Sequence, residues 1–434
     1  MTIGTISSVL RGSLTLATIV LSFGLHGQAQ SESTIFDFTS PGPNTPFAGL
    51  ISDSSGNLYG TTSLGGTTPS SGCGKPHGCG TVFELSPSGS GWTETTLYSF
   101  NGGAAGVLPL SALVFDAQGN LYGTTTGTGQ VGTDTLFPGT IFELSPAPGG
   151  GWTHKVLHEF TGGKDGYFPN GALVLDNAGN LYGTTVYGGD LSCGGLPQPA
   201  GCGLVFKLEH TASGGWAEIV LHAFTGKTEE AYPQGGLVWD AAGNLYGRAF
   251  YGGNECQSYL QCGILYRLTP VLSGGWKFAT IHTFTGGDDG GFPGPIVFDA
   301  SGILYGTTGL GGAANAGSVF RLAPTSKGGW EKKILYSFAG GTDGFVPNSL
   351  VLGPDGILYG STQEGGKLKL CDGGCGTIFA ITPGSNGWSE RVLYSFSYPN
   401  GISPNAVLFS GGNLYGTTIE GGSDNLGVVF EVTP

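Results

Sequence analysis

One hexapeptide recurs through the whole chain and constrains its fold more than any other feature. It reads Asn-Leu-Tyr-Gly-Thr-Thr at its first occurrence, residues 57–62, and occurs seven times in all with small changes. The copies are spaced 54 to 64 residues apart, with their tyrosines at Tyr59, Tyr122, Tyr182, Tyr246, Tyr305, Tyr359 and Tyr415. Similarity at such a period indicates one supersecondary unit copied along the chain, so the fold must be inferred from the unit.

The unit contains four short apolar runs separated by glycine-rich turns. In the second copy we expect strands at 112–115, 120–125, 140–144 and 152–160. No stretch of the unit has a helical period. Four antiparallel strands, repeated seven times, predict an all-β fold, a seven-bladed β-propeller of four-stranded antiparallel blades. The recurring tyrosine, and the tryptophan that opens the fourth strand, are then expected to be core residues.

The two ends of the chain predict how the ring closes. The last unit stops after its third strand, residues 427–432, so its fourth strand is missing. Residues 34–38 resemble a fourth strand, because they align with 96–100 and 156–160, and no other strand precedes them. We expect this N-terminal strand to complete the last blade. Such closure would remove exposed sheet edges.

The charge and composition of the chain argue against two classes of binding partner. The chain has 16 Lys and Arg against 30 Asp and Glu, a formal net charge of −14, and no basic cluster. Nucleic-acid binding needs clustered cations that neutralise phosphates, so we exclude it. Attachment to anionic lipid is disfavoured for the same reason.

The first 29 residues read as a secretory signal peptide. Arg11 gives a positive start, residues 14–25 are mostly apolar, and Gly27-Gln28-Ala29 is a small-x-small cleavage site. We therefore expect residues 30–434 to form one exported propeller domain, secreted or periplasmic and monomeric. No later stretch could span a membrane, and the final residues, which directly follow a strand, suggest no C-terminal anchor.

Eight cysteines form four local pairs at the same place in the repeat, between the second and third strands. The pairs are Cys73 with Cys79, Cys193 with Cys202, Cys256 with Cys262, and Cys371 with Cys375. An exported chain with even, local pairing is expected to form disulfides. A metal site is the alternative, but these spacings, without a partnered histidine, do not match zinc motifs.

The repeat also resembles a known family. The pattern DaxGNLYGTT, GtvFeLsP, GW, vLysF and GGxDGxxP is similar to the tandem repeat of secreted bacterial proteins called GloVer or choice-of-anchor proteins. This resemblance covers essentially the whole mature chain and implies an exported repeat protein, without a defined activity. The D-x-x-G-N-L-Y stretch is also similar to NHL-type and lactonase-type propellers.

In a propeller whose first strand is innermost, two sets of loops leave the ring at one end. These are the loops from the second to the third strand, with all the cysteines, and those from the fourth strand to the next unit, with the GGxDGxxP stretches. We call this end the loop face and expect ligands there, because binding residues commonly lie on loops of a rigid scaffold.

Two sets of residues on the loop face are candidates for ligand binding. Asp165, Asp289 and Asp343 occupy matching positions and could bind Ca²⁺, or could serve turn chemistry. Asn170, Gln234, Asn348 and Asn405 follow a proline, and we expect them at the start of the first strand, at the mouth of the central channel. A ring of carboxamides could hydrogen-bond a sugar, or could cap strand ends.

Non-enzymatic recognition is the function that we expect. The ligand would be an extracellular carbohydrate or protein, with no cofactor apart from Ca²⁺ as an option and no catalytic residues. His158, His222 and His282 lie on successive outer strands and should not converge on one substrate. The alternative is a metal-dependent lactonase- or lyase-type enzyme, which would need inward carboxylates or histidines from several blades.

Overall fold

The computed structural model describes residues 31–434 except 41, 67–72, 74–77, 128–137, 194–200, 227–230, 254–261, 368–370, 372 and 386. The expected signal peptide and Cys256 lie outside these residues. Across the described part of the chain, no helix has the length and apolar character needed to cross a membrane.

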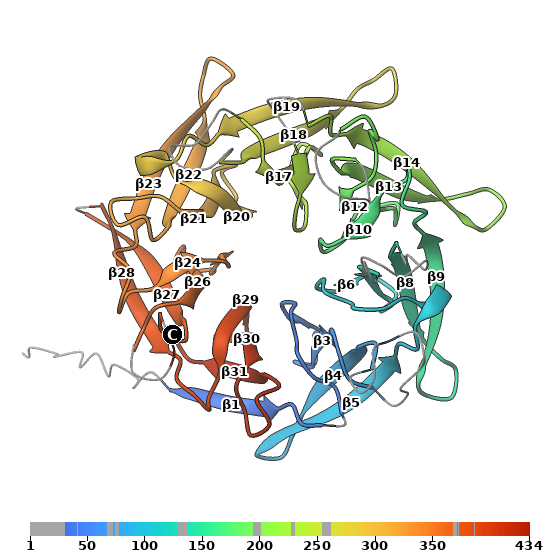
Figure 1. Ribbon diagram of the computed structural model, residues 1–434, viewed down its shortest axis with the longest axis horizontal. Coiled ribbons are helices and arrows are strands. Elements are labelled where there is room, and N and C mark those ends of the chain that lie inside the picture. The colour runs from blue at the N-terminus through green and yellow to red at the C-terminus, as the bar shows by residue number, and fades with distance from the viewer. Residues whose placement is uncertain are drawn as a thin grey trace, which may run out of the picture.

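Seven antiparallel sheets are arranged around a common centre, as Figure 1 shows. Three of the sheets have four strands running from the centre outwards. They are β2 (Ile51–Ser52), β3 (Leu58–Thr62), β4 (Thr81–Ser88) and β5 (Gly91–Ser99); β6 (Val114–Phe115), β7 (Leu121–Thr125), β8 (Thr140–Pro146) and β9 (Trp152–Glu159); and β20 (Gly291–Phe298), β21 (Leu304–Leu310), β22 (Ser318–Pro324) and β23 (Trp330–Ser337).

Three further sheets have an innermost strand divided into two pieces. They are β10 (Tyr167–Pro169) and β11 (Val174–Leu175) with β12 (Leu181–Tyr187), β13 (Leu204–His210) and β14 (Trp216–Ala223); β15 (Ala231–Pro233) and β16 (Val238–Trp239) with β17 (Leu245–Tyr251), β18 (Ile264–Pro270) and β19 (Trp276–Thr283); and β24 (Phe345–Pro347) and β25 (Val351–Leu352) with β26 (Leu358–Glu364), β27 (Thr377–Gly384) and β28 (Gly387–Ser395). Two short 3-10 helices, η1 (Gly103–Ala105) and η2 (Gly287–Asp289), lie in loops.

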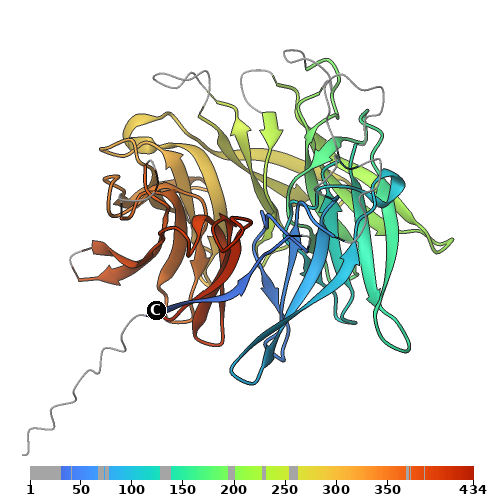
Figure 2. The same ribbon diagram turned by 60° about the horizontal axis from the view of Figure 1, so that its bottom comes forward.

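The seventh sheet joins the two ends of the chain. It consists of β29 (Ile402–Ser410), β30 (Asn413–Glu420), β31 (Val428–Val432) and β1 (Glu32–Asp37). Strand β1 pairs antiparallel with β31, from Glu32 opposite Val432 to Asp37 opposite Val428. Figure 2 shows the blue β1 lying along the red C-terminal strands. The predicted seven-bladed ring, closed by the N-terminal strand, is confirmed.

The innermost strand differs from the expected one. We expected one short run beginning after the recurring proline of the repeat. In three blades pairing instead begins before that proline and resumes after a break. In the third sheet, Tyr167 and Pro169 pair with β12, and pairing returns at Val174. Three of the predicted amides, Asn170, Gln234 and Asn348, therefore lie within the break, and Asn405 lies within β29 at a shift of register.

The residue before each proline adopts a left-handed conformation. The residue has φ between 53° and 60° in every blade, a region that side chains with a Cβ adopt rarely. Its N–H donates a hydrogen bond of 2.8 to 3.2 Å to a carbonyl of the preceding blade. The donor and acceptor pairs are Thr45 and Leu426, Leu108 and Cys79, Phe168 and Pro138, Tyr232 and Cys202, Phe292 and Cys262, Val346 and Ala316, and Ser403 and Cys375.

The proline itself packs against the preceding blade. It faces the glycine that directly precedes the third strand of that blade, and a Cβ on this glycine would lie 2.4 to 2.7 Å from the proline Cδ. Gly203 and Pro233 are one such pair. The glycine and the proline of the repeat are therefore parts of one contact between neighbouring blades.

The Asp and Asn around the recurring tyrosine form a small polar network. Asp116 accepts hydrogen bonds from the Nδ2 of Asn120 at 2.7 Å and the hydroxyl of Tyr122 at 3.1 Å. It also accepts from two backbone amides of its turn, which satisfies the carboxylate where the turn enters β7. The tyrosine ring is buried between neighbouring sheets, as expected for a core residue.

Candidate functional site

The central cavity of the ring has a volume of about 540 Å³. Its wall includes the residue that follows the proline in every blade. These seven residues are Phe47, Leu110, Asn170, Gln234, Gly294, Asn348 and Asn405. The structure thus brings the four predicted carboxamides to one cavity, although their binding of a ligand stays a prediction.

Two of the four carboxamides are occupied in joining blades. The Nδ2 of Asn348 donates to the carbonyl of Pro404 at 2.9 Å, and its Oδ1 accepts from the hydroxyl of Ser361 at 2.8 Å. Asn405, which is 7% exposed, donates to the carbonyl of Pro46 at 2.8 Å. These two side chains therefore have a structural role at the cavity wall.

The other two carboxamides have no side-chain hydrogen bond within the described part of the chain. Asn170 and Gln234 occupy adjacent blades whose backbones are in close contact, because a Cβ on Gly171 would lie 2.2 Å from the carbonyl oxygen of Gly235. Their donors and acceptors are available to a ligand in the cavity. The polar side of the cavity is thus concentrated on this pair of blades.

Arg248 is a cavity residue that our sequence-based candidates missed. It stands on β17, next to Gln234, whose N–H donates to the carbonyl of Arg248 at 3.3 Å. Its Nη1 donates to the carbonyl of Pro293 in the next blade. Removal from water lowers the pKa of the guanidinium to about 10, which leaves it cationic at neutral pH. The sequence did contain a signal for this residue, because Arg248 replaces a threonine of the recurring hexapeptide.

Aromatic rings supply an apolar side to the same cavity. Phe47 is 43% exposed, and Phe250 and Phe292 lie with ring centroids 4.6 Å apart. Aromatic rings in the same wall as amides without a partner in the described chain suit a ligand that has both an apolar face and hydroxyl groups.

The three predicted aspartates are not among the residues that line this cavity. Each accepts hydrogen bonds inside its own loop: Asp165 from the N–H and hydroxyl of Thr161, and Asp343 from the N–H of Ala339 at 2.8 Å. This arrangement is the turn chemistry that we gave as the alternative to a Ca²⁺ site. Calcium binding by these residues stays a prediction.

Asp289 also bridges the outer strands of two blades. It accepts from Nε2 of His282 at 3.0 Å and from Nζ of Lys332, on β23 of the next blade, at 2.7 Å. Burial opposes ionisation, but the hydrogen bonds from His282 and Lys332 and the charge of Lys332 prevail and hold the pKa of Asp289 well below its usual range. The ammonium group of Lys332 also lies 4.6 Å from the ring centroid of Phe284.

At two other blade junctions a glutamate takes the place of that lysine. Glu218 and Glu390 are the second residues after the tryptophan of their outer strands, as Lys332 is. Burial, followed by the charges of Asp165 and Asp343 respectively, raises the pKa of each glutamate to about 7. Each has a buried carboxylate oxygen without a hydrogen-bond partner in the described chain. These like-charged pairs join blades poorly above neutral pH.

Disulfides join cysteines between the second and third strands of the blades, as predicted. Cys73 pairs with Cys79, Cys193 with Cys202 and Cys371 with Cys375, with Cα atoms 5.2, 5.8 and 5.4 Å apart. Cys262 is also disulfide-bonded, and its expected partner, Cys256, lies outside the described residues.

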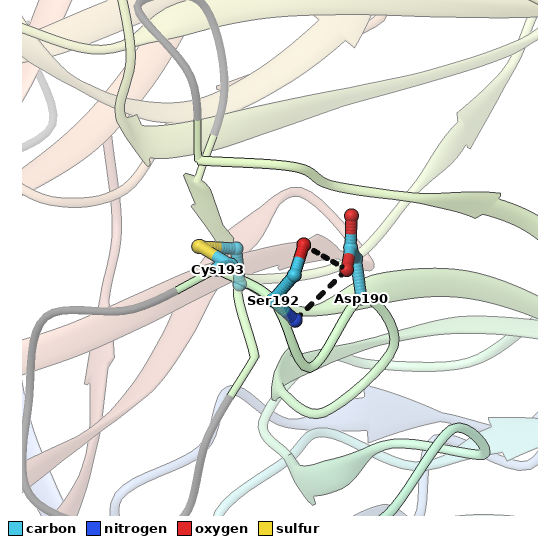
Figure 3. Close-up of a disulfide and its surroundings, with 4 residues drawn as sticks. Asp190, Ser192 and Cys193 are labelled. Carbon is cyan, nitrogen blue, oxygen red and sulfur yellow. Dashed lines mark hydrogen bonds between the residues drawn. A yellow bond between two sulfur atoms is a disulfide. The ribbon is translucent and has the colours of Figure 1, made fainter.

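The described residues next to Cys193 form a turn and a close contact with the disulfide. Figure 3 shows Cys193 beside a turn in which Asp190 accepts from the N–H and hydroxyl of Ser192, at 2.9 and 2.7 Å. Gly226 packs against the disulfide, because a Cβ there would lie 2.1 Å from the sulfur of Cys193.

No group of three or more His, Cys, Asp or Glu side chains is placed to hold a metal ion within the described ranges. The expected outer-strand histidines lie on separate blades, His158 on β9, His222 on β14 and His282 on β19.

Comparison with known proteins gives the fold and the family. None of the curated proteins matches the chain in sequence. A structure from Thermus thermophilus, assigned as an oxidoreductase (glucose dehydrogenase), aligns with a TM-score of 0.43 and 17% identity, over 77% of this chain and 94% of that one.

The extracellular domain of a B. thetaiotaomicron protein assigned as a one-component system aligns with a TM-score of 0.50 and 14% identity, over 93% of this chain and 42% of that one. At this identity the alignment supports the fold alone. The model of the Gloeobacter/Verrucomicrobia repeat matches residues 17–258 and 197–430. The chain therefore belongs to the family of the Gloeobacter/Verrucomicrobia repeat.

Proposed function

We propose that this protein is an exported binding module that holds a carbohydrate in the central cavity of its propeller. The observation that carries the proposal is the composition of the cavity wall. The carboxamides of Asn170 and Gln234, which have no partner among the described residues, lie on adjacent blades, and the wall also includes Phe47, Phe250 and Phe292. A sugar ring presents hydroxyl groups for the amides and C–H faces for the rings.

The disulfides support export and a rigid site. Disulfides persist in oxidising compartments, which agrees with the predicted signal peptide. They also lie one hydrogen bond away from the cavity wall: the carbonyl of Cys202 accepts from Tyr232, two residues before Gln234. A wall fixed in this way loses little conformational entropy when a ligand binds.

A metal-dependent lactonase- or lyase-type enzyme is the competing proposal. Such an enzyme would draw its metal ligands from carboxylates or histidines that face the cavity. In the described part of the chain the cavity wall contains neither, and Arg248 is its charged residue. The composition of the wall therefore favours recognition of a ligand.

The test is calorimetric titration of the mature protein with a panel of neutral and acidic oligosaccharides. We expect at least one class to bind, and a saturating ligand at 100 times its dissociation constant should stabilise the fold by about 2.7 kcal/mol. Asn170→Ala and Gln234→Ala should each weaken binding by about 5- to 30-fold, since each removes about 1–2 kcal/mol of hydrogen bonding.

Gln118→Ala is the matched control, because Gln118 is an exposed amide in the turn between β6 and β7, and its loss should leave binding unchanged. The panel, extended to lactones, is repeated with Ca²⁺ and with EDTA. Lactone turnover that EDTA abolishes would support the enzyme, and a panel without any binding saccharide would overturn the proposal.

A further inference from the structure

Arg248 departs from a pattern that the rest of the ring keeps. The same register of the second strand carries a hydroxyl group in the six other blades, at Thr61, Thr124, Thr184, Thr307, Ser361 and Thr417. Where such a hydroxyl joins two blades it needs only one hydrogen bond, as between Thr184 and the carbonyl of Gly235 at 3.1 Å. The contact between two blades therefore does not need the five N–H donors of a guanidinium.

Most of the donors of Arg248 are free to serve a ligand. A guanidinium has five N–H groups, and within the described chain the hydrogen bond from Nη1 to Pro293 is the one that this side chain makes. No carboxylate of the described residues forms an ion pair with it, and none lines the cavity. A partly buried cation without a counter-ion is costly, so the cavity favours an anion.

The surroundings leave room for the guanidinium beside the free amides. A Cβ on Gly235 would lie 2.7 Å from Nη2 of Arg248, so the glycine gives the guanidinium its space. Gln234 precedes that glycine and Asn170 occupies the adjacent blade. One cation and two amides thus form a compact set of donors in a chain whose net charge is −14.

We propose that the ligand of the central cavity is an acidic saccharide whose carboxylate is bound by Arg248, an inference that rests on the proposed function. A planar guanidinium matches a carboxylate through two parallel hydrogen bonds. One cation suits a single negative charge, so a uronic acid fits better than a doubly charged phosphate ester. The amides of Asn170 and Gln234 would then bind hydroxyl groups of the same sugar ring.

The experiment compares sugars that differ only in the carboxylate. Glucuronate and glucose, and galacturonate and galactose, are titrated into the mature protein, together with short galacturonate oligomers that distinguish a polymer end or segment from the free acid. The wild-type protein should bind each acid about 10- to 100-fold more tightly than its neutral partner, as expected for charge-assisted hydrogen bonds. Affinity for the acids, and not for the neutral sugars, should fall with increasing ionic strength.

Arg248→Thr restores the residue of the repeat and should remove the preference for the acid without changing the affinity for the neutral sugar. Arg248→Lys keeps the charge and should retain part of the preference. Arg391→Thr is the matched control, because it removes one exposed arginine from the outer strand β28 and should change neither affinity. Thermal melting checks that every variant folds.

The two proposals fail in different ways. Equal binding of acid and neutral sugar by the wild type, unaltered by Arg248→Thr, would overturn the role of Arg248 and leave the carbohydrate-binding function in place. Absence of binding by every sugar and oligosaccharide, with a folded protein, would overturn both.

Discussion

The N–H of Tyr232 donates a hydrogen bond of 2.9 Å to the carbonyl of Cys202, so a residue in left-handed conformation on one blade is held by a disulfide-bonded cysteine of the preceding blade. The same bond recurs at Cys79, Cys262 and Cys375. Through these carbonyls the disulfide-bonded cysteines hold the inner strands of the neighbouring blades.

Loss of the Cys193–Cys202 disulfide should loosen the junction with the next blade. For the double variant Cys193→Ser and Cys202→Ser we expect a loss of about 2–3 kcal/mol, as for other short loops, and faster hydrogen exchange at the N–H of Tyr232. The N–H of Phe168, whose acceptor is Pro138, is the internal control and should keep its protection. Equal acceleration at both amides would mean that the disulfide acts on the whole ring.

Deletion of residues 31–38 should destabilise the entire ring. The deletion removes β1 from its pairing with β31 and takes the fully buried ring of Phe38 from the core. It exposes a sheet edge and apolar surface, so we expect a lower melting midpoint and association of the truncated chains. Full-length and truncated proteins are compared by calorimetry and light scattering. A truncated protein that melts like the intact one would contradict the importance of closure.

Glu218 and Glu390 should make the fold less stable as the pH rises from about 4.5 to about 7. Their pKa values are raised to about 7 in the folded protein. Their contribution to the free energy of unfolding is therefore fully present below the unfolded pKa of 4.5 and is lost as the pH rises through the folded pKa. Glu218→Gln with Glu390→Gln should therefore raise the melting midpoint at pH 8. We expect about 1 kcal/mol for each site, after allowance for partial exposure.

Melting curves between pH 4 and 8 check this expectation. Glu331→Gln, an exposed glutamate on β23, is the matched control and should leave the pH dependence of the wild type unchanged. If the double variant kept the full decline between pH 4.5 and 7, these two groups would not be its source.

Asp289 should stabilise the ring above about pH 4. Its lowered pKa means that the stabilisation is present above the unfolded value of 3.8 and is lost as the pH falls through the lower folded value. Asp289→Asn should cost about 1–3 kcal/mol at pH 7, because it leaves the buried Lys332 without its carboxylate, and less under acidic conditions. Asp343→Asn, which removes a carboxylate whose partner is the neutral Tyr336, should cost less at pH 7. Chemical denaturation at several pH values gives both differences.

The architecture could be predicted because the repeat shows most of its structural features in several copies. The Asp116, Asn120 and Tyr122 network, the glycine before each third strand and the stray N-terminal strand all leave a pattern in the sequence. The divided inner strand of three blades left none. The left-handed residue before the proline left none either, because it differs from blade to blade, being Thr45, Leu108 or Phe168 in the first three.

The candidate site was only partly predictable for a related reason. The position after the proline could be placed at the channel, but its occupants divide into Asn348 and Asn405, which join blades, and Asn170 and Gln234, which do not. That division depends on partners from other blades, which a single repeat cannot reveal. Arg248 was visible as a departure from the hexapeptide, but its significance required knowledge of what faces it.

The pairing of β1 with β31 also sets an order of assembly. Glu32 lies near the start of the described chain and Val432 near its end, so their pairing must wait until the last repeat has been synthesised. Until then the first strand has no partner, and the growing row of blades stays open between its first and last members. A chain exported from the N-terminus would therefore complete its ring only after translocation of the final repeat.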